Sequence, residues 1–387
     1  MSRREGRRKQ NKEKAFFDYT MLFIVLFLLG FGLVVLYSVS SYEATLDWDD
    51  SAYYLVKQAK ATAFGLFMMV LVMVIDYHIW QKVAGLAYVV SGILILLVLS
   101  PLGYEVNGAK RWLNVGISLQ PAEVAKVGMI IFFASYVCRI GKNIQSLKGV
   151  VKVLILAAPI SGMVLIITDN LSSAIIIYGI VLIMVFVATP NYKEYFLIAA
   201  GLILTATIFV VLVQKGVLSS EQSYRFGRIE AWLNPEAYAS TTGFQTLQAL
   251  YAIGSGEIFG KGLGQSIQKL GFIPEAQNDM VFSIICEELG LFGAGAVLIM
   301  FVLLIWRFLV VANNAEDMFG ALLVVGVMAH ISLQVILNVA VVTNMIPNTG
   351  ITLPFISYGG SAVVFQLIEI GLVFSVSRHI RLRNAGN

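Results

Sequence analysis

Asp279 is the residue of this sequence best placed to do chemistry, because it stands where a long polar loop meets an apolar segment. The loop runs from Gln214 to Asp279 and ends in the run Gly-Phe-Ile-Pro-Glu-Ala-Gln-Asn-Asp. A carboxylate at the boundary between water and membrane is costly to keep, which makes it a candidate functional residue. It could act as a base toward a substrate, or it could cap the next helix by accepting hydrogen bonds from free amide groups. Glu275 is a second carboxylate in the same run.

Two further sets of charged residues lie inside apolar segments. Glu123 and Lys126 are three residues apart, which places both on one face of a helix, where they can form an ion pair. The pair could orient neighbouring helices, line a polar cavity beside a substrate, or do both. Glu287 and Glu288 follow Asp279 by eight and nine residues. Adjacent acids in a membrane need partners, so we expect this helix to face the interior of a bundle.

Cations gather in two polar segments that we expect on the same side of the membrane as Asp279. They could contact lipid phosphates, or they could bind a pyrophosphate, for which the fork-shaped guanidinium of arginine is well suited. These cations are Lys110, Arg111, Arg225, Arg228, Lys261 and Lys269.

The segment 338–361 holds two prolines and three glycines, which break helices. Irregular backbone at membrane depth is tolerated only where it is buried in protein or lines a cavity. The segment is therefore predicted to form the wall of a site. Ser357 and Tyr358, near its end, are candidate substrate-binding residues.

The composition is that of an integral membrane protein. Hydrophobic residues make up 58% of the chain, charged residues 13%, and the mean hydropathy is +0.82. Since a span needs about 20 apolar residues, we expect an all-α polytopic protein with about ten transmembrane helices. The ten segments are roughly 17–40, 58–76, 83–100, 121–139, 150–167, 170–189, 194–213, 280–306, 318–344 and 356–377.

The distribution of charge predicts the orientation of the chain. Of the 27 lysine and arginine residues, 17 fall on one side of the predicted spans and 9 on the other, with Lys126 inside a span. The positive-inside rule then places both termini in the cytoplasm and the loop 214–279, between helices 7 and 8, outside. We expect one transmembrane domain over 17–380, flanked by a basic tail at 1–16 and a short cytoplasmic tail at 381–387.

The long loop is expected to lie partly on the membrane. Its part 224–235 alternates cations with aromatic residues and ends at a proline, which indicates a short interfacial helix. Its part 244–253 is apolar but too short to span, which favours a re-entrant or interfacial segment. The basic tail is expected to contact anionic lipid, and it lacks the aromatic residues that would favour nucleic-acid binding. No cysteine or histidine spacing predicts a metal site.

Four motifs in order resemble the FtsW/RodA/SpoVE family, the SEDS proteins of bacterial shape, elongation, division and sporulation. They are Gly-Ala-Lys-Arg-Trp at 108–112, Gln-Pro-Ala-Glu-Val-Ala-Lys at 120–126, Pro-Glu-Ala-Gln-Asn-Asp at 274–279, and the stretch that ends in Leu-Pro-Phe-Ile-Ser-Tyr-Gly-Gly-Ser at 353–361. The last of these is the most specific. The resemblance covers nearly the whole chain after the basic tail.

The resemblance implies a peptidoglycan glycosyltransferase of the bacterial cytoplasmic membrane. Such an enzyme polymerises lipid II, the undecaprenyl-pyrophosphate-linked disaccharide pentapeptide, on the outer face. It works with a class B penicillin-binding protein, a transpeptidase, and with other divisome proteins. The overall pattern is more similar to the division and sporulation members, which implies a place at a septum. Asp279 corresponds to the essential loop aspartate of the family.

The expected chemistry is a single displacement with inversion at the anomeric carbon. The 4-hydroxyl of one sugar attacks the anomeric carbon of another, and a positioned base such as Asp279 helps by about 10²–10⁴-fold. The pyrophosphate that leaves needs charge neutralisation more than protonation. Lys110 and Arg111 are candidates for this task, and a divalent cation, Mg²⁺ or Mn²⁺, is left open.

Two other functions fit the same residues. Ionisable residues and broken helices inside the membrane are also typical of a transporter, here a lipid II flippase. A non-enzymatic scaffold for a transpeptidase is the third possibility. Polymer formed by detergent-solubilised protein, which has no two compartments, separates an enzyme from both.

Overall fold

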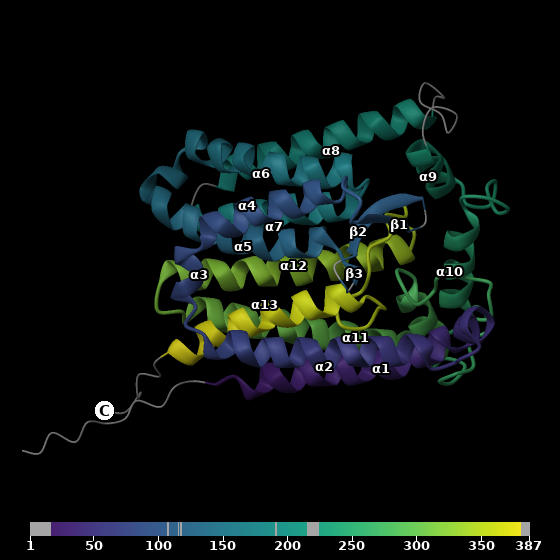
Figure 1. The fold of residues 1–387 in the computed structure, drawn as a ribbon. Helices are drawn as coiled ribbons and strands as arrows, with labels where there is room; N and C mark the ends of the chain where they lie inside the picture. The colour runs from purple at the N-terminus through teal and green to yellow at the C-terminus, as the bar shows by residue number, and fades with distance from the viewer. Residues whose placement is uncertain are drawn as a thin grey trace, which may run out of the picture.

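The protein is a bundle of long, roughly antiparallel helices in a computed structural model that describes residues 17–106, 108–114, 116, 118–189, 192–214 and 224–380 (Figure 1). In this part of the chain, eight helices are long and apolar enough to cross a membrane. They are α1 (Tyr19–Trp48), α2 (Tyr53–Val74), α5 (Pro121–Ile140), α6 (Leu147–Ile167), α7 (Leu171–Ala188), α11 (Val281–Asn313), α12 (Met318–Val342) and α13 (Gly360–His379).

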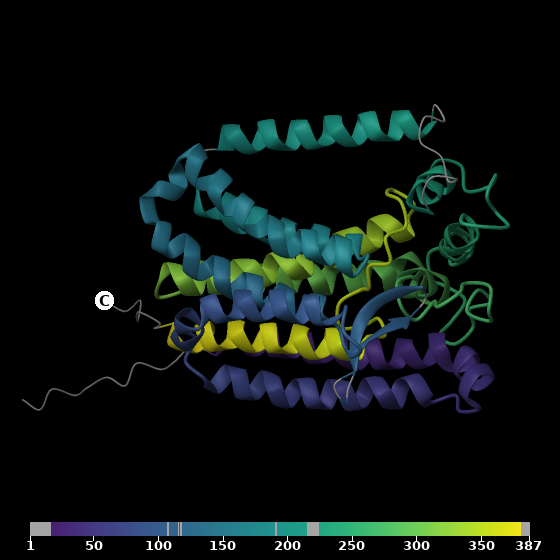
Figure 2. The same ribbon diagram turned by 45° about the horizontal axis from the view of Figure 1, so that its top comes forward.

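Two further helices complete the bundle and confirm the predicted polytopic all-α fold. They are α4 (Ala84–Leu97), which is shorter, and α8 (Tyr192–Gln214). Each of the ten apolar segments predicted from the sequence coincides with one of these ten helices. Figure 2 shows α8 at the edge of the bundle, away from the central helices. The predicted tails at 1–16 and 381–387 lie outside the described residues.

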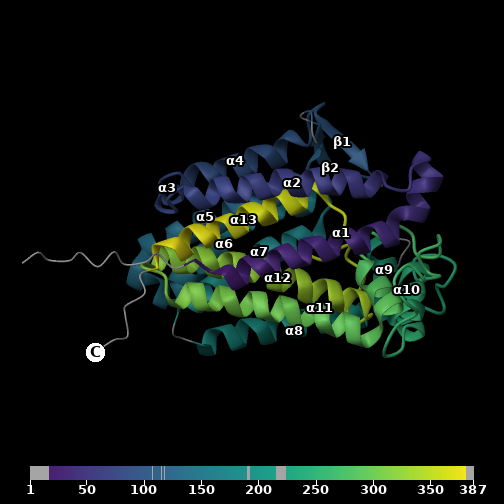
Figure 3. The same ribbon diagram turned by 90° about the horizontal axis from the view of Figure 1, so that it is seen from below.

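The two ends of the bundle are built differently. At one end, here called the terminal end, the described chain begins and finishes, and the short helices α3 (His78–Lys82) and η1 (Gly141–Gln145) connect longer ones. At the other, the loop end, lie α9 (Tyr224–Leu233) and α10 (Phe244–Ser255), as Figures 1 and 3 show. The helix α9 matches the short helix predicted at 224–235, and α10 covers the apolar segment 244–253, for which the sequence predicted a re-entrant or interfacial segment.

A small sheet at the loop end was not predicted. Its strands β1 (Gly103–Val106), β2 (Ala109–Asn114) and β3 (Ser118–Leu119) pair antiparallel in the order β1-β2-β3. The sequence does carry a signal for it, because the pair Asn107-Gly108 between two short runs is the strongest local mark of a hairpin. The sheet carries Lys110 and Arg111 on β2.

The centre of the bundle is formed by α5, α7 and α12, with α13 packed between α12 and α2. Close packing there depends on small residues. A Cβ added at Gly32 of α1 would lie 2.5 Å from the carbonyl oxygen of Phe355. The missing side chain of Gly32 thus lets the irregular segment between α12 and α13 pack against α1 near the middle of that helix.

Candidate functional site

Asp279 lies two residues before α11, at the loop end of the bundle. The N-cap residue of α11 is Met280, and this helix end has no side-chain cap. Asp279 therefore does not cap this helix, which was the alternative to a role as a base. Its side chain is partly buried, and its carboxylate is left to interact with residues of the surrounding loops.

Gln245 of α10 and two residues of the segment between α12 and α13, Asn348 and Gly350, lie around the Asp279 carboxylate. Gln245 of α10 directs its side-chain amide to Asp279 Oδ1 at 3.5 Å and to the Pro274 carbonyl at 3.1 Å. Asn348 in turn donates to Gln245 Oε1 at 2.9 Å. A Cβ added at Gly350, which has a φ of 69°, would lie 3.8 Å from Asp279 Oδ2. The backbone after Asn348 thus passes beside the carboxylate, and glycine keeps that approach open.

The electrostatics of this position favour a carboxyl group that can exchange a proton near neutral pH. Burial raises the pKa of Asp279 from 3.8 to about 6, and the charge of Glu275 acts in the same direction. The Asp279 amide and the charge of Arg228 partly offset the rise. Glu275 itself accepts a hydrogen bond from Asn278 Nδ2 at 3.0 Å. A base with a pKa near 6 is charged at pH 7 and still basic enough to take a proton.

The side chain of Asn338, on α12, holds the backbone at Asp279 in place. Its side-chain amide donates to the Asp279 carbonyl at 2.8 Å and to the Ile351 carbonyl at 2.6 Å, and the side chain is fully buried. One side chain therefore joins α12, the start of α11 and the segment between α12 and α13. The sequence prediction missed Gln245, Asn338 and Asn348 as site residues, although it did mark 338–361 as a site wall.

The segment between α12 and α13 is held by side chains from several helices, and its role as the wall of a site stays a prediction. Trp232 of α9 donates to the Asn344 carbonyl at 3.0 Å, and Ser172 of α7 donates to the Thr349 carbonyl. Gln58 of α2 binds the backbone at Ser357 and Gly359. The segment is thus fixed in position despite its irregular backbone.

Ser357 and Tyr358, which the sequence marked as substrate-binding candidates, have structural contacts here. The buried Ser357 hydroxyl accepts from the Leu353 amide at 2.8 Å. The Tyr358 amide donates to the Gln277 carbonyl at 2.9 Å, and its ring packs edge-on against Tyr54, with the ring centroids 5.0 Å apart. Tyr358 therefore ties this segment to the Asp279 loop, and contact of either residue with a substrate stays a prediction.

The predicted cations are distributed over the loop end, and several of them already have partners. Lys110 is exposed on β2, whereas Arg111 donates to the carbonyls of Thr168 at 3.1 Å and Asp169 at 2.8 Å. Arg228 donates to the Asn348 carbonyl at 3.4 Å, which places it near Asp279. The side chain of Arg225, in α9, lies outside the described residues.

Glu123 and Lys126 form the ion pair that their spacing predicts, and the pair is part of a longer buried network. Lys126 Nζ lies 2.7 Å from Glu123 Oε1 and 3.2 Å from Nε2 of His330 on α12. His330 Nδ1 lies 2.7 Å from Oε2 of Glu369 on α13. The four side chains are buried. They connect α5, α12 and α13 in the interior of the bundle, which gives the pair a structural role beside its predicted role at the substrate.

Glu287 and Glu288 have the partners that adjacent buried acids require, and these partners come from the long loop. Lys261 Nζ lies 2.6 Å from Glu287 Oε1, and Lys269 Nζ lies 2.7 Å from Glu288 Oε1. Ser38 of α1 also donates to Glu288 at 2.8 Å. The buried Lys269, a predicted substrate-binding residue, is thus occupied by an ion pair that fastens the loop to α11, and a contact with substrate stays a prediction.

Within the described part of the chain, no group of three or more histidine, cysteine, aspartate or glutamate side chains is placed to hold a metal ion. The two cysteines, Cys138 and Cys286, are not joined by a disulfide. Near Asp279, the second carboxylate is Glu275. Two carboxylates are fewer ligands than a metal site made only of protein requires.

Known proteins of similar sequence and structure exist for nearly the whole chain. A family model named for FtsW, RodA and SpoVE and described as "Cell cycle protein" matches residues 19–382. "Stage V sporulation protein E" of Bacillus subtilis is 38% identical over 368 residues, which cover 94% of this chain and 98% of that protein. "Probable peptidoglycan glycosyltransferase FtsW" of Trichlorobacter lovleyi is 34% identical over 369 residues, 95% of this chain and 94% of that one.

Solved structures show the same fold. A chain from the study "Structural coordination of polymerization and crosslinking by a peptidoglycan synthase complex" has a TM-score of 0.77 at 26% identity and covers 95% of this chain and 99% of its own. The crystal structure of the rod shape determining protein RodA of Thermus thermophilus has a TM-score of 0.68 at 25% identity, with 95% and 98% covered.

Proposed function

We propose that this chain, which belongs to the FtsW/RodA/SpoVE family, polymerises lipid II with Asp279 as the general base. The chain is a peptidoglycan glycosyltransferase, the activity in the name of its FtsW relatives. The finer assignment depends above all on the position of the Asp279 carboxylate, which is partly buried at the loop end and is not used as a helix cap. Burial there raises the pKa of Asp279 to about 6.

In the proposed reaction, Asp279 takes the proton of the 4-hydroxyl of one sugar as that oxygen attacks the anomeric carbon of another. The bond from this carbon to the pyrophosphate breaks, and the configuration at the carbon inverts. Arg228, which lies near Asp279, and the exposed Lys110 are suited to balance the charge of the leaving pyrophosphate. Both carbonyl contacts of Arg111 hold β2 in place, which supports the position of Lys110.

The position of Asp279 suits a substrate that has one part in lipid and the other in water. Lipid II carries a polyprenyl tail and a sugar-peptide head, so its reacting atoms lie close to the membrane surface. Asp279 lies two residues before the first residue of the apolar helix α11. The positive-inside distribution of lysine and arginine supports placing the loop end outside the cytoplasm and both termini inside.

A divalent cation is compatible with this site as a partner of the substrate. Asp279 and Glu275 could each offer one carboxylate oxygen, and the pyrophosphate of lipid II would supply further oxygen ligands. Such an ion would neutralise the leaving group. Asp279 accepts the proton, and the residues around it hold its side chain in place.

The proposed setting is the septum of a dividing or sporulating cell, with a class B penicillin-binding protein as the transpeptidase partner. The sequence relatives include a stage V sporulation protein and several proteins named FtsW. The structural neighbour comes from a complex that coordinates polymerization and crosslinking. Localisation of a fluorescent fusion to septa, rather than along the side wall, tests this setting.

Polymerisation by the purified protein tests the proposed activity. The detergent-solubilised chain, alone and with a class B penicillin-binding protein, is supplied with labelled lipid II, and the products are separated by size on a gel. We expect glycan strands longer than the disaccharide. If well-folded protein with its partner makes no polymer but moves lipid II across vesicle membranes, the protein is a flippase. If it only binds the transpeptidase, it is a scaffold.

The pH dependence of polymerisation follows from the pKa of Asp279. A base works in its deprotonated form, so activity should rise with pH through about 6, and the rate at pH 5 should be about a tenth of the plateau at pH 8. Replacing Arg228, which lowers this pKa, should shift the midpoint to higher pH in the Arg228→Gln variant. Rates are measured over pH 5–8, with a melting curve at each pH as the control for folding. A flat profile for folded protein would contradict the assignment.

A further inference from the structure

The part of the long loop that follows α10 exposes large apolar side chains. We define the apolar tip as Ile258, Phe259 and Leu263 of the loop together with Leu291 and Phe292 of α11. The exposed fraction is 60% for Ile258, 80% for Phe259, 70% for Leu291 and 73% for Phe292. Contiguous apolar surface of this kind marks contact with protein or membrane.

The backbone of the apolar tip has the internal hydrogen bonds that contact with lipid would require. The helix α11 breaks at Gly290, where φ is 65° and ψ is −170°. Backbone groups of the loop form hydrogen bonds with α11 on both sides of this break. The Lys261 and Gly262 amides donate to the carbonyls of Glu287 and Glu288, each at 2.9 Å. In return, the Leu291 and Phe292 amides donate to the carbonyls of Glu257 and Ile258, at 2.9 Å and 3.0 Å. Backbone at membrane depth is tolerated when its polar groups are paired in this way.

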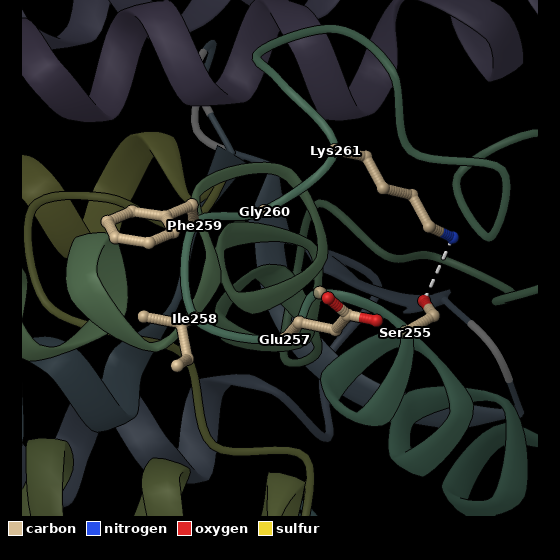
Figure 4. A pocket seen from close by; sticks show the side chains of 7 residues that line it. Ser255, Glu257, Ile258, Phe259, Gly260 and Lys261 are labelled. Carbon is tan, nitrogen blue, oxygen red and sulfur yellow. Dashed lines mark hydrogen bonds between the residues drawn. The ribbon is translucent and has the colours of Figure 1, made fainter.

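Charged groups beside the apolar tip are paired or point away from it. Figure 4 shows the side chains of Ile258 and Phe259 directed away from those of Ser255 and Lys261, around a cavity of about 370 Å³ that all four residues line. Lys261 donates to Ser255 Oγ at 2.9 Å and is paired with Glu287. The exposed Glu257 lies on the same cavity, where it can reach water. The loop thus has one polar and one apolar side.

The apolar tip continues the lipid-facing surface of α11. Phe292, Ile299, Leu303 and Trp306 are all exposed, and their spacings of seven, four and three residues place them on one face of the helix. The part of α11 after the break, 291–313, is long enough to cross a membrane by itself. In a span of 291–313, Phe292 lies at the end toward the loop, and the backbone of Ile258 lies beside it, joined by a hydrogen bond of 3.0 Å.

We propose that the apolar tip is embedded in the lipid leaflet at the loop end, with Phe259 among the upper parts of phospholipid acyl chains. The occupant of this surface is thus lipid, and the cavity side of the loop lies at headgroup level. Because the apolar tip is fastened to α11 by four backbone hydrogen bonds, its contact with lipid holds the loop at a fixed depth. This inference does not depend on the catalytic role of Asp279.

A fluorescent probe at position 259 tests the proposal without measuring activity. In a background with Cys138→Ser and Cys286→Ala, single cysteines are introduced as Phe259→Cys and, as the matched control on the exposed turn after α9, Ser240→Cys. Each is labelled with a nitrobenzoxadiazole dye and reconstituted in phosphatidylcholine nanodiscs. We expect a blue-shifted emission at 259 that is quenched by lipids carrying a nitroxide near the headgroup and protected from aqueous iodide. Position 240 should show the reverse.

Two results would overturn the proposal. Quenching of position 259 by iodide to the same extent as position 240 would place the apolar tip in water. Protection of position 259 from both quenchers would show that protein, another copy or a segment of this chain, covers it. A second labelled variant, Phe292→Cys, guards against a local disturbance at 259, because it should report the same lipid quenching from the α11 side of the apolar tip.

Discussion

The Asp279→Asn variant is expected to polymerise lipid II about 10²–10⁴-fold more slowly than the unchanged protein, while folding normally. Asparagine has the same shape as aspartate and can still accept the hydrogen bond from Gln245. It cannot accept a proton from the attacking hydroxyl at neutral pH. The loss should therefore appear in the rate of the chemical step, measured as the initial rate of glycan formation by purified protein with its partner.

Glu275→Gln is the matched control for this variant, because Glu275 lies in the same loop and its charge acts on Asp279. Removing that charge should lower the pKa of Asp279 and leave polymerisation within a few-fold of normal. Elution volume and melting temperature verify that both variants fold. Polymer formed at the normal rate by Asp279→Asn would show that this carboxylate is not the base. A large loss in Glu275→Gln as well would point to a joint role of the two acids, such as metal binding.

The Lys269→Met variant is expected to lose about 3–5 kcal/mol of stability, the cost of leaving a buried charge without its partner. Lys269 and Glu288 are both buried, and their charged atoms lie 2.7 Å apart. Methionine fills a similar volume but provides no charge, so the Glu288 carboxylate would retain only Ser38 and the Ser266 amide as donors. The measurement is the midpoint of thermal unfolding in detergent. Unfolding is detected because it exposes the buried Cys286 to a fluorogenic maleimide.

Two comparisons separate the ion pair from a general effect of the substitution. Adding Glu288→Gln to Lys269→Met removes the unpaired charge and should restore most of the lost stability. Lys261→Met should cost less than Lys269→Met, because Lys261 is partly exposed and its partner Glu287 also accepts hydrogen bonds from Ser266 and Ile267. If the double variant is no more stable than Lys269→Met alone, the pair does not carry the stability assigned to it.

The sequence was enough to predict the ten apolar helices in their order and the position of the candidate base. Ten apolar segments became ten helices, because a chain in lipid must pair its backbone groups within each segment. The pairing of Glu123 with Lys126 was also predictable, because residues three apart on a helix always lie side by side. Asp279 could be identified for the same kind of local reason, its place at the boundary of an apolar segment.

Which distant residues meet became known only from the packing of the helices and loops. The sequence indicated that Glu287 and Glu288 have partners, but it did not identify them as Lys261 and Lys269. It also gave no sign that His330 contacts Glu369. The same holds for the residues around Asp279, since Gln245, Asn338 and Asn348 come from three separate elements. Periodicity fixes the face on which a side chain lies, whereas its partner depends on how helices and loops pack against one another, which is a property of the whole chain.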